Sequence, residues 1–142
     1  MSESPKPRVL FVCVENSCRS QMAEAFARLS FADRLEAASA GSQASGEINP
    51  KAIAAMAELG YDLTRHASKS LATLPDIEWD FVVTMGCGDA CPNLRARRRI
   101  DWQIPQPKDM APAEFARVRD LVREHVAQLA QALANDSAPR SQ

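Results

Sequence analysis

A short apolar run, followed by a cysteine-containing loop and a helix, constrains the fold of this chain most. Residues 9–12, Val-Leu-Phe-Val, form a continuous apolar run that ends at Cys13. Such a run is typical of a strand buried on both faces of a parallel sheet. From Ser20 onward, apolar residues recur at helical spacing. The pattern predicts that residues 13–19 form a loop between a buried strand and a helix.

The rest of the chain predicts further strands that alternate with helices. Strands are expected at residues 81–85 and 99–102, and helices at residues 50–59, at 68–74 and from 112 onward. Asn49 is expected to cap the helix at 50–59, after a loop over residues 40–49. This alternation indicates a small doubly wound α/β sheet, in which ligands bind at the carboxyl ends of the strands.

Length and charge limit the classes of protein that the chain can represent. Its 142 residues suit one domain, expected at residues 8–134 between a disordered N-terminus (1–7) and a flexible tail (135–142). The net charge of -1 gives no reason to expect a nucleic acid or a membrane surface as partner. No apolar run approaches the roughly 20 residues that span a bilayer, and a secretory signal is lacking. We therefore expect a cytoplasmic monomer, in which cysteines serve reactivity or metal binding rather than structural disulfides.

Cys13 and Arg19 make a Cys-x5-Arg loop, which we name the oxyanion loop (residues 13–19). A loop that closes onto a helix N-terminus points several backbone N–H groups inward and so forms an anion site. The same field favours the thiolate of Cys13, and the Arg19 guanidinium can hold two oxygens of a tetrahedral oxyanion. The Ser20 hydroxyl is placed to bond the Cys13 sulfur, and Asn16 can adopt the left-handed conformation. The candidate substrate-binding residues are Val14, Glu15, Asn16, Ser17, Cys18, Arg19 and Ser20.

The spacing of this loop is less specific than its context. The chain has 13 arginines, and Cys91 and Arg97 repeat the Cys-x5-Arg spacing. That second match follows a glycine-rich loop instead of a strand and leads into further arginines. Only Cys13 has a buried strand before it and a helix after it, which favours an oxyanion loop over an ordinary structural turn.

Residues 13–24, Cys-Val-Glu-Asn-Ser-Cys-Arg-Ser-Gln-Met-Ala-Glu, resemble the signature of arsenate reductases built on the low-molecular-weight tyrosine phosphatase fold. The resemblance continues through residues 39–41, 49–50, 66–68, 82–85 and 101–102. It covers nearly the whole domain. It implies a four-stranded parallel sheet with helices on both faces, and the reduction of arsenate to arsenite in arsenic detoxification.

The second cysteine pair, Cys87 and Cys91, follows the strand expected at residues 81–85. An oxyanion reductase must supply two electrons, and a dithiol that becomes a disulfide supplies them. The resemblance implies that Cys13 attacks arsenate, Cys87 resolves the adduct, and Cys91 takes over the disulfide, which thioredoxin then reduces. Only three residues separate the pair, fewer than in thioredoxin-coupled relatives, so glutaredoxin or another thiol such as mycothiol is also considered. The alternative is a pair of inert loop cysteines.

Two other readings of the cysteines carry less weight. Cys18 lies inside the oxyanion loop, and simple packing is favoured over a redox role such as a bridge to Cys13. The spacings Cys13-x4-Cys18 and Cys87-x3-Cys91 could serve a zinc site. Zinc would however lie beside Arg19, a repelling cation, so we expect no metal and no cofactor.

The relatives carry an aspartate before a proline in the loop after Asp101-Trp102, and this aspartate is the general acid. Gln106 stands at that position, and a glutamine cannot donate a carboxylic proton. Gln106 can still hydrogen-bond an arsenate oxygen, and Asp109 could replace the acid if the loop curls inward. Loss of the acid impairs ester cleavage most. It favours the reductase, with weak phosphatase side activity, over a low-molecular-weight protein tyrosine phosphatase or a non-catalytic oxyanion-binding module.

Some relatives bind potassium near this loop. Asn16, Glu24 and Ser39 are present, but Ala67 and Lys69 stand where a threonine and an aspartate would serve. Lys69 is expected either to place its ammonium group at the cation position, paired with Glu24, or to be solvated. In both cases we expect little potassium dependence.

Two remaining features are assigned mainly structural roles. His66 is expected to be a hydrogen-bonding residue rather than a base. The arginine-rich run at residues 95–99 is expected to be a solvated face that could also dock an acidic reductant.

Overall fold

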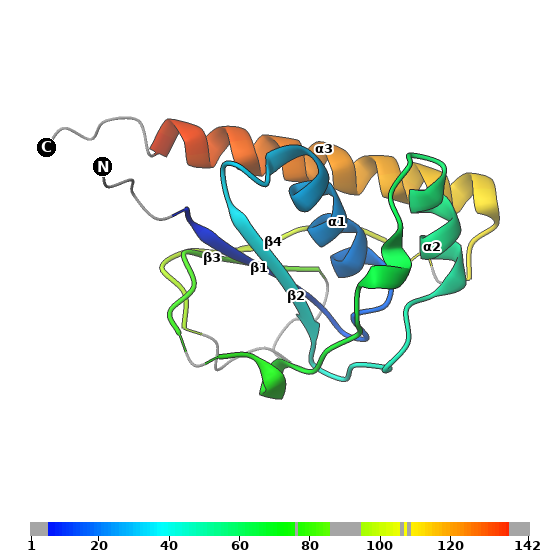
Figure 1. Ribbon diagram of the computed structural model, residues 1–142, viewed down its shortest axis with the longest axis horizontal. Helices are drawn as coiled ribbons and strands as arrows, with labels where there is room; N and C mark the ends of the chain where they lie inside the picture. The colour runs from blue at the N-terminus through cyan, green and yellow to red at the C-terminus, as the bar shows by residue number, and fades with distance from the viewer. Residues whose placement is uncertain (1–5, 76, 86–94, 106, 108, 137–142) are drawn as a thin grey trace, which may run out of the picture.

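Four parallel strands form one sheet in the computed structural model, which describes residues 6–75, 77–85, 95–105, 107 and 109–136. The sheet order is β2-β1-β3-β4, as Figure 1 shows. The strands are β1 (Arg8–Cys13), β2 (Glu36–Gly41), β3 (Phe81–Thr84) and β4 (Arg99–Asp101). The helices are α1 (Arg19–Phe31), α2 (Pro50–Ala57) and α3 (Pro112–Asp136), with two short 3-10 helices, η1 (Leu63–Arg65) and η2 (Leu71–Thr73). The predicted fold class, a single α/β domain with a four-stranded parallel sheet, is confirmed.

Strand β1 lies in the interior of the sheet because its side chains are apolar on both faces. Residues 9–13 are at most 2% exposed. Val9, Phe11 and Cys13 pack in the larger core with the three α-helices, whereas Leu10 and Val12 pack in a smaller cluster with Trp79 and Val82. The buried apolar run therefore has the environment that the sequence predicted.

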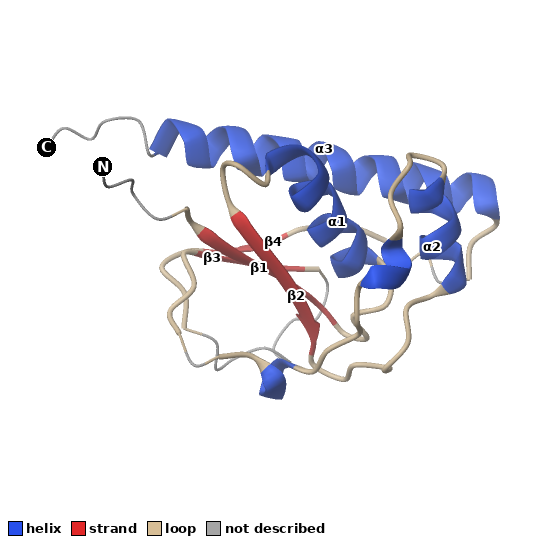
Figure 2. Ribbon diagram, viewed as in Figure 1, coloured by secondary structure: helices blue, strands red, loops and turns tan. Residues whose placement is uncertain are grey.

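The three α-helices lie on one face of the sheet, and Figure 2 shows them together above the strands. The smaller cluster on the other face is covered by the segment around η2, including Leu71, Leu74 and Ile77. The expectation of helices on both faces therefore fails for the described residues. Ser70 caps η2 by accepting from the Ala72 N–H, and the 3-10 helix ends after a single turn.

Three local expectations differ from the structure. Residues 40 and 41 belong to β2 instead of a loop, because the backbone of Glu36–Gly41 pairs with β1 along its whole length. The helix expected at residues 68–74 is limited to η2, and Ser70 instead forms a bridge with Gly41. Helix α3 continues to Asp136, past the expected domain boundary at 134. The predicted cap of α2 is confirmed, since the Asn49 side chain accepts from the Lys51 N–H at 2.8 Å.

The described part of the N-terminus contacts the domain. The Lys6 ammonium group donates to the Ala32 carbonyl at 2.9 Å, and the Pro7 carbonyl accepts from the Glu36 N–H. Within the described ranges, no helix combines the length and the apolar character needed to cross a membrane.

Candidate active site

The oxyanion loop connects Cys13, the last residue of β1, with Arg19, the first residue of α1. It turns sharply at Asn16, which has a φ of 52° and is fully buried. This confirms the predicted left-handed residue. Asparagine tolerates that conformation better than most residues that carry a Cβ atom. The turn brings the carboxyl end of the central strand against the N-terminus of a helix.

The carbonyl groups of the loop face neighbouring segments of the same chain. They accept hydrogen bonds from the following donors: Gln43 N–H to Val14 at 2.8 Å, Ser45 N–H and Ser68 hydroxyl to Glu15 at 3.0 and 3.1 Å, and Asn49 N–H to Ser17 at 3.1 Å. Across the described chain, the N–H groups of Val14, Asn16, Ser17 and Cys18 have no acceptor. N–H groups without an acceptor at a helix N-terminus are suited to bind an anion.

Gly41, at the end of β2, lies directly against the loop. A Cβ atom at this position would be 2.5 Å from the Val14 carbonyl oxygen and 2.9 Å from the Asn16 nitrogen. The requirement for glycine is therefore steric. Only a residue without a side chain lets β2 support the loop at this distance.

Arg19 is oriented by the segment that follows β4. Its Nη1 atom donates to the Ile104 carbonyl at 3.0 Å, and the whole residue is only 6% exposed. Its Nε atom is buried and has no hydrogen-bond partner among the described residues. A buried guanidinium N–H without an acceptor is costly unless a ligand supplies one. The Nε edge of Arg19 is thus available for an oxyanion, while Nη1 holds the group in place.

The Cys13 sulfur contacts a hydroxyl group whose orientation is determined by its other neighbour. The Ser20 oxygen lies 2.8 Å from Sγ of Cys13 and accepts from Nδ2 of Asn16, also at 2.8 Å. Because Asn16 supplies that hydrogen, the Ser20 hydroxyl is free to donate its own hydrogen to the sulfur. Such a bond stabilises a thiolate. The predicted contact between Ser20 and Cys13 is confirmed.

Gln21 and His66 extend this network behind the loop. Nε2 of Gln21 donates to Oδ1 of Asn16 and to the Ala67 carbonyl, both at 2.9 Å. Its Oε1 atom accepts from Nδ1 of His66 at 2.9 Å, and Nε2 of His66 lies 2.6 Å from the Tyr61 hydroxyl. Burial lowers the pKa of His66 below its ordinary value, against the opposing effect of Glu24. His66 is therefore a neutral hydrogen-bonding residue, as predicted from the sequence.

Glu24 is buried beside this network and is paired differently from the expectation. Its carboxylate accepts from Nε of Arg28 at 2.7 Å and from the Ser39 hydroxyl at 2.6 Å. The ammonium group of Lys69 instead lies 3.4 Å from the Ala67 carbonyl. Among the described residues, Arg28 and not Lys69 neutralises Glu24. The expected pair between Lys69 and Glu24 is wrong.

Cys18 is buried in the larger core. Burial raises the pKa of its thiol to about 11, and the Ser17 hydroxyl only partly offsets this effect. Cys18 is therefore a neutral thiol near pH 7, which agrees with a packing role. Cys13 and Cys18 are both free thiols in the structure.

The other sequence candidates lie at the edge of, or outside, the described chain. Cys87, Cys91 and Gln106 fall outside the described residues. Asp109 is exposed, and no described contact joins it to the oxyanion loop. The described residues contain no group of three potential metal ligands, but the zinc alternative also requires the two cysteines outside that range.

Comparison with known proteins places this site in a family. Residues 8–139 match the model of the low molecular weight phosphotyrosine protein phosphatase family, so the chain belongs to this family. Within the family it is similar to arsenate reductases. "Arsenate reductase 1" of Staphylococcus epidermidis is 40% identical over 122 residues, which are 83% of this chain and 91% of the relative. "Glutaredoxin arsenate reductase" of Synechocystis is 37% identical over 125 residues, 86% and 95% of the two chains.

Solved structures agree with this placement. An arsenate reductase in the phosphate binding state has a TM-score of 0.82 and 35% identity, over 89% of this chain and 98% of the other. The thioredoxin-dependent arsenate reductase of Corynebacterium glutamicum has a TM-score of 0.77 and 29% identity, over 96% of this chain and 66% of that protein. The resemblance inferred from the sequence is confirmed.

Proposed function

We propose that this chain reduces arsenate to arsenite with Cys13 as the nucleophile. One observation carries the proposal. In the described part of the chain, the buried Nε of Arg19 and several N–H groups of the loop that begins at Cys13 have no hydrogen-bond acceptor. This arrangement suits a tetrahedral oxyanion held against a thiolate. The similarity to arsenate reductases supports arsenate as that oxyanion.

In the first step, the Arg19 guanidinium and the loop N–H groups bind the arsenate oxygens. The Cys13 thiolate attacks arsenic, a sulfur–arsenic bond forms, and one protonated oxygen leaves as water. Arsenic keeps its oxidation state of +5 in this step. The Ser20 hydroxyl stabilises the thiolate before the attack and must release it as the new bond forms.

In the second step, the thiolate of Cys87 attacks the sulfur of Cys13. A disulfide bond forms, the sulfur–arsenic bond breaks, and its electron pair stays on arsenic, which becomes arsenite. Cys91 then attacks Cys87, which frees Cys13 and leaves a Cys87–Cys91 disulfide. An external dithiol reduces this disulfide and is itself oxidised. The roles of Cys87 and Cys91 are inferred from their positions in the sequence.

The acid position also supports reductase over phosphatase. Gln106 cannot protonate a leaving alkoxide or phenoxide, so ester hydrolysis loses its general acid. Arsenate exchanges its oxygen ligands readily, so the leaving oxygen depends less on a positioned acid. Gln106 would act as a hydrogen-bond donor to an arsenate oxygen, with Asp109 as the alternative source of a carboxyl group.

The electron donor is proposed to be a small thiol protein in the cytoplasm. The names of two similar proteins point to glutaredoxin in one case and to thioredoxin in the other. Mycothiol is a third candidate. We also propose that the chain acts as a monomer without a metal or a cofactor.

Serine substitutions test the proposal. Arsenite formation is measured with thioredoxin, glutaredoxin with glutathione, mycothiol and dithiothreitol as separate reductants. Cys13→Ser is expected to abolish arsenite formation with every reductant, whereas Cys18→Ser, the matched change in the same loop, should retain it. Arsenite formation by Cys13→Ser would refute the mechanism. Survival of activity in Cys87→Ser would refute only the relay, and one tightly held zinc per chain would refute the thiol chemistry.

A further inference from the structure

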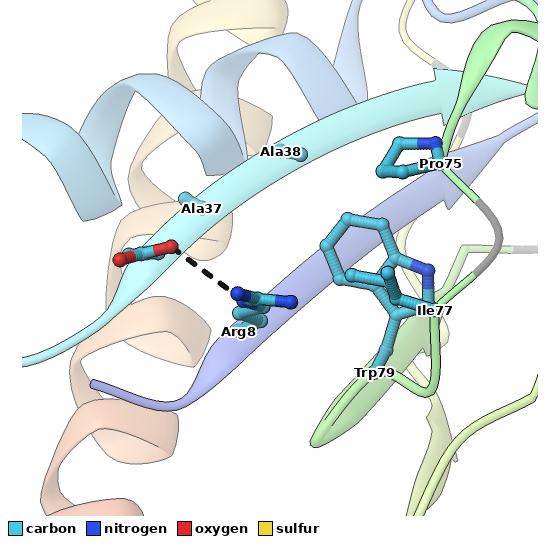
Figure 3. A pocket seen from close by; sticks show the side chains of 7 residues that line it. Arg8, Ala37, Ala38, Pro75, Ile77 and Trp79 are labelled. Carbon is cyan, nitrogen blue, oxygen red and sulfur yellow. Dashed lines mark ion pairs between the residues drawn. The ribbon is translucent and has the colours of Figure 1, made fainter. Parts of the chain in front are cut away.

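A hollow of about 390 Å³ lies at the opposite end of the sheet from Cys13 (Figure 3). Arg8, the first residue of β1, and Glu36, the first residue of β2, form part of its lining, and their side chains approach to 3.8 Å. The apolar side chains of Pro75, Ile77 and Trp79 line it as well. The hollow therefore combines an apolar wall with a charged rim, and it is separate from the oxyanion loop.

An arginine run (Arg95, Arg97, Arg98 and Arg99) is joined through its backbone to Trp79, which lines this hollow. The segment is fixed to Trp79 by two backbone hydrogen bonds, from Trp79 N–H to the Arg95 carbonyl at 2.9 Å and from Arg97 N–H to the Trp79 carbonyl at 2.8 Å. All four arginine residues are exposed. Four exposed arginines thus lie on a segment that is bonded to the wall of the hollow.

Asp80 connects the two features. Its carboxylate accepts from the Arg8 N–H at 2.8 Å and lies 3.6 Å from the Arg97 guanidinium. At this end of the described chain, the carboxylates of Glu36, Glu78 and Asp80 accompany the arginines.

We propose that the hollow and the arginine run form a docking surface for an acidic thiol–disulfide reductant protein. The inference rests on the proposed function, because a reductase of this kind must be recharged after each turnover. Protein interfaces are enriched in arginine, and the four arginines of the run are exposed. The run also begins four residues after Cys91 in the sequence, next to the segment that carries the cysteine pair.

Electrostatic attraction predicts a specific kinetic signature. A positive surface steers an acidic partner and raises its association rate by about 10-fold or more at low salt. The attraction weakens as the Debye length falls from about 10 Å at 0.1 M to about 3 Å at 1 M salt. Dithiothreitol is small and uncharged, so it needs no docking surface.

The experiment compares two double charge reversals with the same change in net charge. Arg95→Glu with Arg98→Glu changes the proposed surface, and Arg117→Glu with Arg123→Glu changes exposed positions of α3 as the control. For each, kcat/KM is measured with respect to thioredoxin and to glutaredoxin at saturating arsenate, in low and high salt. Dithiothreitol-driven turnover is measured in parallel.

We expect the surface variant to lose about 10-fold in kcat/KM for the protein reductant at low salt, with a smaller loss at high salt. The control variant and all dithiothreitol rates should match the wild type. An equal loss with dithiothreitol, or in the control, would overturn the proposal. Turnover with dithiothreitol but with neither thioredoxin nor glutaredoxin would also overturn the docking proposal. The proposed reduction of arsenate would still stand in that case. If the wild type self-associates and the Arg95→Glu, Arg98→Glu variant does not, the surface binds a second copy of this chain and the proposal is wrong.

Discussion

At the residue scale, the Ser20 hydroxyl lies 2.8 Å from the sulfur of Cys13, the candidate nucleophile. Asn16 donates to the Ser20 oxygen, so the hydroxyl hydrogen remains available to a Cys13 thiolate. A hydrogen bond to a charged acceptor contributes about 1.5–3 kcal/mol. About 1.4 kcal/mol corresponds to a factor of ten in an equilibrium.

Ser20→Ala is therefore expected to slow the alkylation of Cys13 by iodoacetamide at pH 7 by about 10-fold, and arsenate reduction with it. The alkylation rate is followed by mass spectrometry of the reduced protein. Ser17→Ala is the matched control, because it removes a hydroxyl from the same loop without touching the Cys13 sulfur. Equal rates in the two variants would show that the hydroxyl of Ser20 does not stabilise the thiolate.

We expect Gln106 to influence the balance between arsenate reduction and phosphate-ester hydrolysis. Gln106→Asp would restore a carboxylic acid at the position where relatives hold their general acid. General acid catalysis contributes about 10²–10⁴-fold, so hydrolysis of p-nitrophenyl phosphate should rise by at least about 10-fold. The release of p-nitrophenol is followed spectrophotometrically.

Asp109→Asn supplies the control for this change. It should leave the weak hydrolysis of the parent protein unaltered if Asp109, exposed in the structure, takes no part in proton transfer. A strong decrease would assign the compensating acid to Asp109. No gain in Gln106→Asp would mean that the absence of an acid does not explain the preference for reduction.

At the scale of the elements, β2 is as important to the site as the loop that binds the oxyanion. Its last residue, Gly41, would place a Cβ atom 2.5 Å from the Val14 carbonyl, well inside contact distance. The loop must shift to relieve that overlap. Because the loop N–H groups form the anion site as a set, a shift of the backbone should weaken binding even if the fold survives.

Gly41→Ala is expected to weaken phosphate binding by the reduced protein by about 10-fold or more, measured by titration calorimetry. Gly46→Ala is the matched control. Gly46 has a φ of +86° and open space around its Cα atom, so alanine there costs conformational strain of about 1–2 kcal/mol but meets no neighbour. The control should lower the melting temperature without changing phosphate affinity. If both variants bind phosphate like the parent, β2 does not position the loop.

The elements also explain which features could be predicted from the sequence. The strand–loop–helix unit was predictable because Val9–Val12 is continuously apolar and the following helix has clear periodicity. Strand β2, Glu-Ala-Ala-Ser-Ala-Gly, has few β-branched or aromatic residues and was missed. The Ser-Ala-Gly segment at its end was recognised only through the family resemblance. Its steric role depends on a contact with the loop that is distant in sequence.

The partners of buried charges were predictable only in part. Ser20 and Asn16 act within four residues of the loop centre, so local geometry suggested their roles. A pair between Glu24 and Lys69 was one of two alternatives, suggested by analogy with a cation site. Glu24 instead pairs with Arg28, one helical turn further along α1. The N–H of Lys69 and Nε2 of Gln21 both donate to Oδ1 of Asn16. This oxygen is thus already satisfied, which supports the expectation of little potassium dependence.

At the scale of the whole molecule, the sheet separates the two proposed activities. Cys13 ends β1 and Arg8 begins it, so the oxyanion loop and the proposed docking surface occupy opposite ends of the same strand. The chain can therefore bind a small anion and a protein partner at once without direct competition. Polar groups pack behind the oxyanion loop, and among those described the pKa of His66 is lowered by burial.

The pH dependence of stability follows from the lowered pKa of His66. Burial disfavours its charged form, Arg28 and Lys69 act in the same direction, and Glu24 opposes them. Above pH 6.5 the histidine is neutral in both the folded and the unfolded chain and contributes no slope. Below pH 6.5 the unfolded chain takes up the proton first, so the free energy of unfolding falls as the pH falls.

We expect urea unfolding of the wild type to show this loss between pH 7.5 and 5.5. His66→Asn, whose amide can still donate to Gln21, should lose less stability over the same range. Parallel curves for the two proteins would mean that protonation of His66 does not limit the stability of the fold.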